Sequence, residues 1–134
     1  MKTTLLTLML LTGSAYAQDS TSIVQVVAEL HATGSKKEAV KYFMETYNLS
    51  KPNKYMIEDS ECAEFIEPEG NYYICEDVIY YNFFGDEMYD LIYKELASMF
   101  MIIKFTPEDG TTYFGDYIQL TKAEDQHHYM VFLF

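Results

Sequence analysis

Two stretches in the first half of the chain carry apolar residues at helical spacing. Between residues 20 and 33, Ile23, Val26, Val27 and Leu30 recur every three or four positions, and Gly34 follows as a stop signal. Ser35-Lys36-Lys37-Glu38 then matches a capping box, which predicts a second helix that ends before Pro52. Together they predict a helical hairpin whose apolar stripes pack against another element.

From Cys62 to Cys75 the pattern changes to strand-forming residues on both sides of a turn. Glu67-Pro68-Glu69-Gly70 fits a type I turn, in which Pro supplies the second position and Gly tolerates a positive φ. A two-residue loop places Cys62 opposite Cys75, whereas a three-residue loop with a bulge at Gly70 offsets them by one. Both registers allow a disulfide, which would contribute about 3 kcal/mol. Two free buried thiols are the alternative.

The remaining elements follow from the same patterns. Residues 54–58 predict a short strand, and residues 77–84 are ambiguous between a strand and a buried turn, with their β-branched and aromatic content favouring a strand. A third helix begins at Gly85-Asp86 with acidic residues in its first turn. Its predicted apolar stripe is Met88, Leu91, Ile92, Leu96, Met99 and Phe100.

The last third predicts three strands, at residues 101–106, 111–121 and 127–134, with Gly115 marking a bend or bulge in the second. Residues 130–134 are apolar on both faces, which suits a central or covered strand.

The predicted order is helix, helix, three strands, helix, three strands (ααβββαβββ). It indicates an α+β fold with a curved antiparallel sheet packed by the N-terminal helical hairpin and one further helix. This order resembles the cone-shaped folds of the nuclear-transport-factor-2-like superfamily, whose members enclose an apolar pocket between sheet and helices. A cystatin-like sheet around one helix is the alternative. The resemblance lies in element order alone, with no residue motif behind it, so membership is not inferred.

The first 17 residues predict a cleaved signal peptide. Lys2 supplies a short basic start, Leu5 to Leu11 an apolar core, and Ala15-Tyr16-Ala17 a cleavage site. Residues 18–134 then form a single globular domain. Two cysteines that form one bridge suit an oxidising compartment, so we expect a secreted or periplasmic protein. No later stretch approaches the roughly 20 apolar residues of a membrane span, so no membrane insertion is expected.

Charge narrows the class of partner. The chain has 21 acidic and 9 basic residues, for a net charge of −12, and all the basic residues are Lys. The absence of Arg and the negative field argue against nucleic acid and anionic membranes. They favour a basic protein partner or a cation, with solubility alone as the alternative. Among 13 Tyr and 9 Phe, any ring left outside beside carboxylates would form an adhesive face.

No catalytic motif is present: there is no Gly-x-Ser-x-Gly, His-Glu-x-x-His, phosphate-binding loop or Cys-x-x-Cys. His127 and His128, near Glu124 and Asp125, are the candidates for a metal site. Adjacent strand residues point to opposite faces, so the two His do not chelate one ion together. We therefore predict no metal and no cofactor, and His side chains that are partly exposed and titrate below neutral pH. His31 is expected to complement the C-terminus of the first helix.

Three hypotheses of function follow. The first is an exported acidic binding protein, an inhibitor or immunity-type factor that captures a basic protein through Glu64, Glu67, Glu69, Tyr72 and Tyr73. The second is a small-ligand carrier with an apolar cavity between sheet and helices. The third is a small enzyme on the same cone-shaped fold, with an inward Asp or His as base. The oligomeric state stays open, because the sequence does not identify the exposed sheet edge that could pair two copies.

Overall fold

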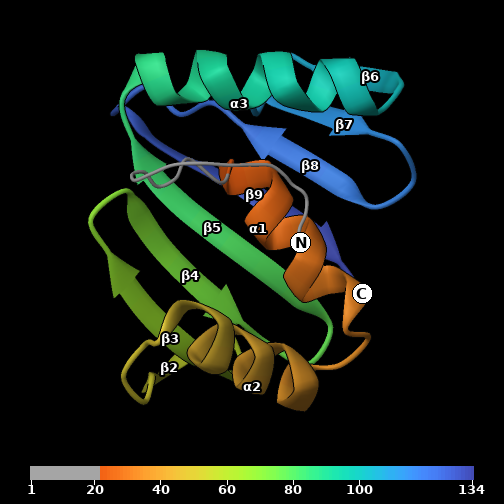
Figure 1. Cartoon of the computed structure of the whole chain (residues 1–134). Helices are drawn as coiled ribbons and strands as arrows, with labels where there is room; N and C mark the ends of the chain where they lie inside the picture. The colour runs from red at the N-terminus through yellow and green to blue at the C-terminus, as the bar shows by residue number, and fades with distance from the viewer. Residues whose placement is uncertain (1–21) are drawn as a thin grey trace, which may run out of the picture.

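The computed structural model of the chain describes residues 22–134 (Figure 1), and the predicted signal peptide lies outside them. The helices are α1 (Ile23–Ala32), α2 (Lys36–Tyr47) and α3 (Asp86–Met99). The strands before α3 are β2 (Asn53–Ile57), β3 (Ser60–Glu67), β4 (Gly70–Ile74) and β5 (Val78–Phe84). The strands after α3 are β6 (Ile102–Thr106), β7 (Thr111–Phe114), β8 (Ile118–Thr121) and β9 (His127–Leu133).

All eight strands form one antiparallel sheet in the order β2-β3-β4-β5-β9-β8-β7-β6. The predicted α+β class, with a curved antiparallel sheet packed by helices, is confirmed. The sheet has two strands more than the expected order. Residues 78–84 form the full strand β5, and the predicted strand 111–121 is divided at Gly115, whose φ of +55° turns the chain between β7 and β8. β9 pairs with β5 along its whole length at the centre of the sheet, as its apolar faces predicted.

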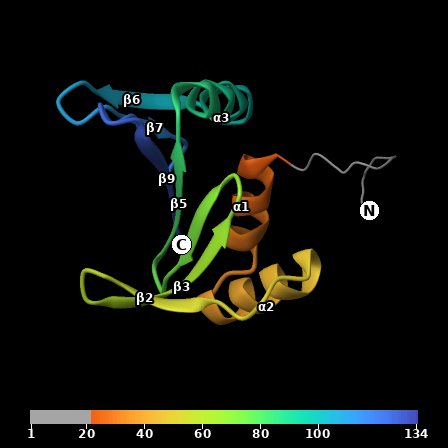
Figure 2. The same ribbon diagram turned by 90° about the vertical axis from the view of Figure 1, so that its left-hand side faces the viewer.

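The three helices pack on one face of the sheet (Figure 2). Alternate residues of the central strands point toward them, so Ile79, Tyr81 and Phe83 of β5 are buried in the main core. The intervening residues Tyr80 and Asn82 point to the opposite face. No helix of residues 22–134 covers that opposite face, which we call the helix-free face.

Local signals place the helix ends where the sequence predicted them. The Ser35 side-chain oxygen accepts a hydrogen bond from the Glu38 backbone N–H at 3.3 Å, which caps α2. Asn48 ends α2 in the left-handed conformation with φ 54°. Both predicted helices of the N-terminal hairpin are confirmed, and they pack against each other as well as against the sheet.

The predicted stripe of α3 is partly wrong. Tyr89, Ile92 and Leu96 are buried, whereas Leu91 and Met99 are 65% and 52% exposed. The buried side of the helix includes Tyr89, whose ring packs edge-on against the buried His128, with ring centroids 5.2 Å apart. Leu91 and Met99 therefore lie on the solvent side of the helix, although their spacing suits a buried stripe.

Candidate functional site

The hairpin of β3 and β4 is closed by a disulfide between Cys62 and Cys75, as predicted, with their Cα atoms 4.3 Å apart. Glu67 pairs with Gly70, so the loop is the two-residue form, and the two cysteines lie opposite each other. Gly70 serves a purpose other than the predicted positive φ, because its φ does not lie in that region. A Cβ there would lie 2.6 Å from the Asn82 carbonyl oxygen and 2.7 Å from the Tyr81 ring.

The tip of this hairpin is held rigidly by two buried phenol groups. The Tyr72 hydroxyl donates to a carboxylate oxygen of Glu69 at 3.0 Å, and the Tyr81 hydroxyl donates to the Glu69 backbone carbonyl at 2.8 Å. Burial, reinforced by the Glu69 charge, raises the pKa of both phenols, so both stay protonated donors. Partial burial and the nearby Glu69 charge raise the pKa of the Glu67 carboxyl.

The five residues predicted to contact a partner are divided between two faces of the sheet. Tyr72 is 1% exposed and packs in the core against Phe43, with ring centroids 4.9 Å apart. Its neighbour Tyr73 points to the helix-free face, where Glu64 is its register partner on β3. Glu67 and Glu69 lie at the hairpin tip. Tyr72 is therefore part of the core, and Glu64 and Tyr73 belong to a different surface.

Four tyrosines from four strands gather on that surface, which we call the tyrosine face: Tyr55, Tyr73, Tyr80 and Tyr129, together with Glu64. The rings of Tyr55 and Tyr73 are 5.0 Å apart, and Tyr73 is the register partner of Tyr80. Tyr55 and Tyr129 are 46% and 38% exposed. The disulfide lies among these rings, because Cys62 and Cys75 pack with Tyr73 and Tyr80 in a small second core.

Carboxylates lie next to these phenols. Burial raises the pKa of Tyr73, and the neighbouring Glu64 carboxylate raises it further. The pKa of Tyr80 is raised by burial and then by the charge of Glu58. The phenols are consequently held as neutral hydrogen-bond donors beside acids. Such a surface offers ring faces, hydroxyl groups and negative charge to a ligand.

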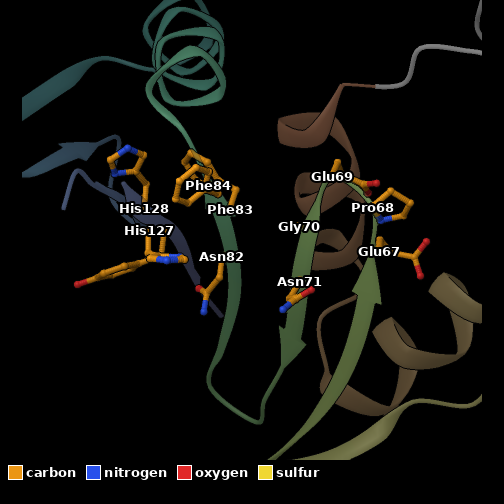
Figure 3. Close-up of a pocket in the computed structure, with 11 residues that line it drawn as sticks. Glu67, Pro68, Glu69, Gly70, Asn71, Asn82, Phe83, Phe84, His127 and His128 are labelled. Carbon is orange, nitrogen blue, oxygen red and sulfur yellow. The ribbon is translucent and has the colours of Figure 1, made fainter. Parts of the chain in front are cut away.

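An open pocket of about 380 Å³ adjoins the tyrosine face and shares Tyr129 with it (Figure 3). Its walls come from the hairpin tip, the end of β5 and the start of β9. Figure 3 shows Glu67 and Glu69 extending away from His127 and His128, with Asn71 and Asn82 between the two walls. Phe84 packs edge-on against the exposed His127, with ring centroids 5.1 Å apart. The pocket is therefore aromatic and amide-lined on one side, with the acids at its outer border.

His128 is buried, contrary to the prediction of two partly exposed His. Its Nδ1 accepts the Ala123 backbone N–H at 3.0 Å, which leaves Nε2–H to donate to the Asp86 carboxylate at 2.9 Å. The Gln126 side chain makes two hydrogen bonds to the same residue. Its amide N–H donates to the Asp86 carboxylate, and its amide oxygen accepts the Asp86 backbone N–H. The hydrogen bonds that the Asp86 carboxylate accepts, first from His128 and then from Gln126, lower its pKa.

This network joins the start of α3 to the turn before β9, and it does not form a catalytic dyad. Both nitrogens of His128 are occupied, so neither is available to take a proton from a substrate or to bind a metal. Within residues 22–134, no group of three His, Cys, Asp or Glu side chains is arranged to hold a metal ion.

His31 lies in the last turn of α1, where it was expected, and it also joins this helix to the end of β9. Its Nε2–H donates to the Leu133 carbonyl at 2.8 Å, and its ring stacks on Tyr117 with centroids 4.6 Å apart. No sequence signal indicated this contact, because the two partners are distant along the chain.

No helix in the described part of the chain is long and apolar enough to cross a membrane.

Comparisons with protein-family models, with curated protein sequences and with solved structures found no match to this chain.

Proposed function

We propose that this protein is an exported acidic binding protein, of inhibitor or immunity type, that captures a basic protein through its tyrosine face. The observation that supports the proposal is a sheet face without helices on which Tyr55 and Tyr129 remain exposed and Glu64 is the register partner of Tyr73. Tyr brings large contact area at low entropic cost, which is why binding surfaces are rich in it.

The charge of the chain suits a basic partner. A net charge of −12 attracts a basic protein from a distance and raises its association rate. At contact, Lys and Arg side chains of the partner interact favourably with both the Glu64 carboxylate and the faces of the neighbouring tyrosine rings.

Rigidity of the face supports the same function. Tyr73 and Tyr80 are held by strand pairing, and the disulfide between Cys62 and Cys75 packs beneath them. A surface that is ordered before binding loses little conformational entropy when the partner arrives. Glu67, at the hairpin tip bordering the face, adds steering charge, whereas Glu69 is already engaged by Tyr72.

The other two hypotheses receive less support from the described residues. A carrier would hold its ligand between sheet and helices, where Tyr72, Tyr81 and Phe132 are packed in the core with less than 2% exposure. An enzyme would need a free base, whereas both nitrogens of the buried His128 are already hydrogen-bonded. The disulfide supports the proposed secretion, because such bridges form in oxidising compartments.

The test is capture from native extracts by the chain from Gln18 onward, at low and moderately high salt, followed by titration with the purified partner. We expect a basic protein, captured stoichiometrically and released by salt. The double variant Tyr55→Ser/Tyr129→Ser should weaken its binding by at least about tenfold, as loss of aromatic contacts does. Glu64→Gln should slow association and reduce the salt dependence.

Matched controls lie on other surfaces. Leu91→Ser removes an exposed apolar side chain from α3, and Glu45→Gln removes an exposed charge from α2. Neither should change the affinity. If no basic protein binds at low salt, or if the tyrosine pair can be removed without loss of affinity, the proposal is wrong.

A further inference from the structure

The end strand β6 leaves one edge of the sheet unpaired. It pairs with β7 on one side and is the last strand of the sheet on the other. Its side chains are exposed on both faces: Ile102, Ile103 and Phe105 are 46%, 56% and 56% exposed. The preceding Met99 and Met101 are exposed as well, so the apolar surface continues onto the end of α3. We call these five residues the β6 edge.

This edge is free of acidic residues in a strongly acidic chain. No Asp or Glu occurs from Leu96 to Pro107, and Lys104 is the single charge within β6. The opposite sheet edge differs. β2 itself also lacks acidic residues, but its partner strand β3 places Glu64 opposite Asn53 and Glu61 opposite Met56, whereas β7, the partner of β6, carries no charged residue. Of the two edges, the β6 edge is thus the surface on which a second copy of this chain meets the least electrostatic repulsion.

We propose that the β6 edge binds a second copy of the chain, by antiparallel pairing of β6 with β6 about a two-fold axis. An antiparallel strand edge is complementary to itself, because each N–H and C=O meets its counterpart after a two-fold rotation. Pairing centred on Ile103 sets Lys104 opposite Ile102 of the partner subunit, so that the two lysines do not face each other.

The pairing of β6 with β7 is irregular, which restricts the registers in which another strand can add to this edge. The register between β6 and β7 shifts between Ile102 and Lys104, and Ile103 has no partner on β7. Bulges and lysines on an edge limit indiscriminate strand addition. A two-fold pair occupies both β6 edges and leaves only the charged β2 edges free, so the assembly stops at a dimer.

The dimer does not depend on the proposed function. β6 and β2 are at opposite ends of the sheet, and the tyrosine face is built on β2, β3, β4, β5 and β9. The dimer and the proposed capture of a basic protein also respond to salt in opposite directions. Two chains of net charge −12 repel each other, and salt screens this repulsion, so added salt should strengthen the dimer. Added salt should weaken the capture of a basic partner.

Sedimentation equilibrium of the purified chain over a range of protein and salt concentrations tests the proposal. We expect a monomer–dimer equilibrium that shifts toward dimer at higher salt. Ile103→Glu places a carboxylate from each copy at the centre of the pairing and should weaken the dimer by about a hundredfold. Ile66→Glu is the matched control, because Ile66 is another exposed strand isoleucine, 63% exposed.

Amide hydrogen exchange provides a second readout. Peptides covering residues 99–106 should exchange more slowly as the protein concentration rises, while those covering β2 stay unchanged. Circular dichroism checks that Ile103→Glu folds, and Phe105→Ser replaces it if it does not. A monomer at every concentration and salt, an equal effect of Ile66→Glu, or a dimer without slower exchange at residues 99–106 would each overturn the proposal.

Discussion

Gly70 shows how a single position serves the hairpin through the space it leaves. The Tyr81 ring passes over this residue to reach the Glu69 carbonyl, and the Asn82 carbonyl lies close to it as well. Any side chain would displace the backbone of β5 or the Tyr81 ring. The type I turn alone does not reveal this requirement, because the two groups that occupy the space belong to another strand.

We therefore predict that Gly70→Asn lowers the free energy of unfolding by about 2–3 kcal/mol, as overpacking does. Gly34→Asn is the control, since Gly34 has φ +88° and no atom lies within 4 Å of its added Cβ. Asn adopts positive φ values more readily than most residues, so the strain of the control should cost clearly less than the overpacking at Gly70. Urea unfolding of both variants measures the difference, and equal losses would contradict this account of Gly70.

The hydrogen-bonded Asp86 carboxylate should make the free energy of unfolding depend on pH. Its pKa in the folded state lies below the ordinary value of 3.8, mainly because of the hydrogen bond from His128. The contribution of Asp86 to the free energy of unfolding is therefore fully present when the pH lies above the pKa of this carboxyl in the unfolded chain. It is lost as the pH falls through the lower pKa of the folded state. Asp86→Asn should be less stable at neutral pH and should lose less stability in acid than the unmodified chain.

Urea unfolding from neutral pH down to about pH 2 measures this effect. Asp90→Asn, which makes the same charge change one turn further along α3, is the control. Its free energy of unfolding should fall in acid as steeply as that of the unmodified chain. If Asp86→Asn loses stability in acid as steeply as the unmodified chain does, the network adds no stability through this carboxylate.

Among the elements, the disulfide hairpin is the one whose local signals were most complete. Pro68 and Gly70 marked the turn, and the two cysteines marked the ends. Replacing both Cys62 and Cys75 with Ala should lower the free energy of unfolding by about 3 kcal/mol in the chain-entropy model. Unfolding of the reduced, unmodified chain should give a similar loss. If reduction leaves the stability unchanged, the bridge does not restrain the unfolded chain as expected.

Helix α2 has a prediction of the same kind. Ser35→Ala removes the side-chain oxygen that accepts the Glu38 N–H and should cost about 1 kcal/mol of stability. Ser50→Ala, at an exposed position after the helix, is the control and should change stability little. A thermal unfolding series that includes Ser35→Asp separates the cap from other effects, because Asp caps as well as Ser does.

At the scale of the whole molecule, two separate surfaces carry the two proposals, and salt should act on them in opposite directions. Raising the salt concentration from about 0.05 to 0.5 M shortens the range of electrostatic interactions several-fold. Binding of the basic partner should weaken over this range while the dimer strengthens. Tyr55→Ser/Tyr129→Ser should affect only the partner and Ile103→Glu only the dimer, as partner titrations and sedimentation at each salt concentration will show. A variant that alters both would mean that the surfaces overlap.

The candidate site was predicted in part, and the reason lies in strand parity. The sequence indicated that some tyrosines would lie outside beside carboxylates, and it selected the hairpin. It assigned Tyr72 and Tyr73 to the same surface, although neighbouring residues in a strand point to opposite faces. Which of the two faces the helices cover depends on packing between distant elements, so Tyr72 became core and Tyr73 part of the tyrosine face. His127 and His128 separate in the same way.

By itself, the sequence determined the helical hairpin, the disulfide-closed strands, the third helix and the α+β class. These depend on caps, turns and periodicity, which act within a few residues. Only the tertiary structure decided that β5 pairs with β9, that β2 and β6 are the edges, and that one sheet face stays free of helices. Such choices depend on how apolar surfaces far apart in the chain bury one another, and no local pattern records that outcome.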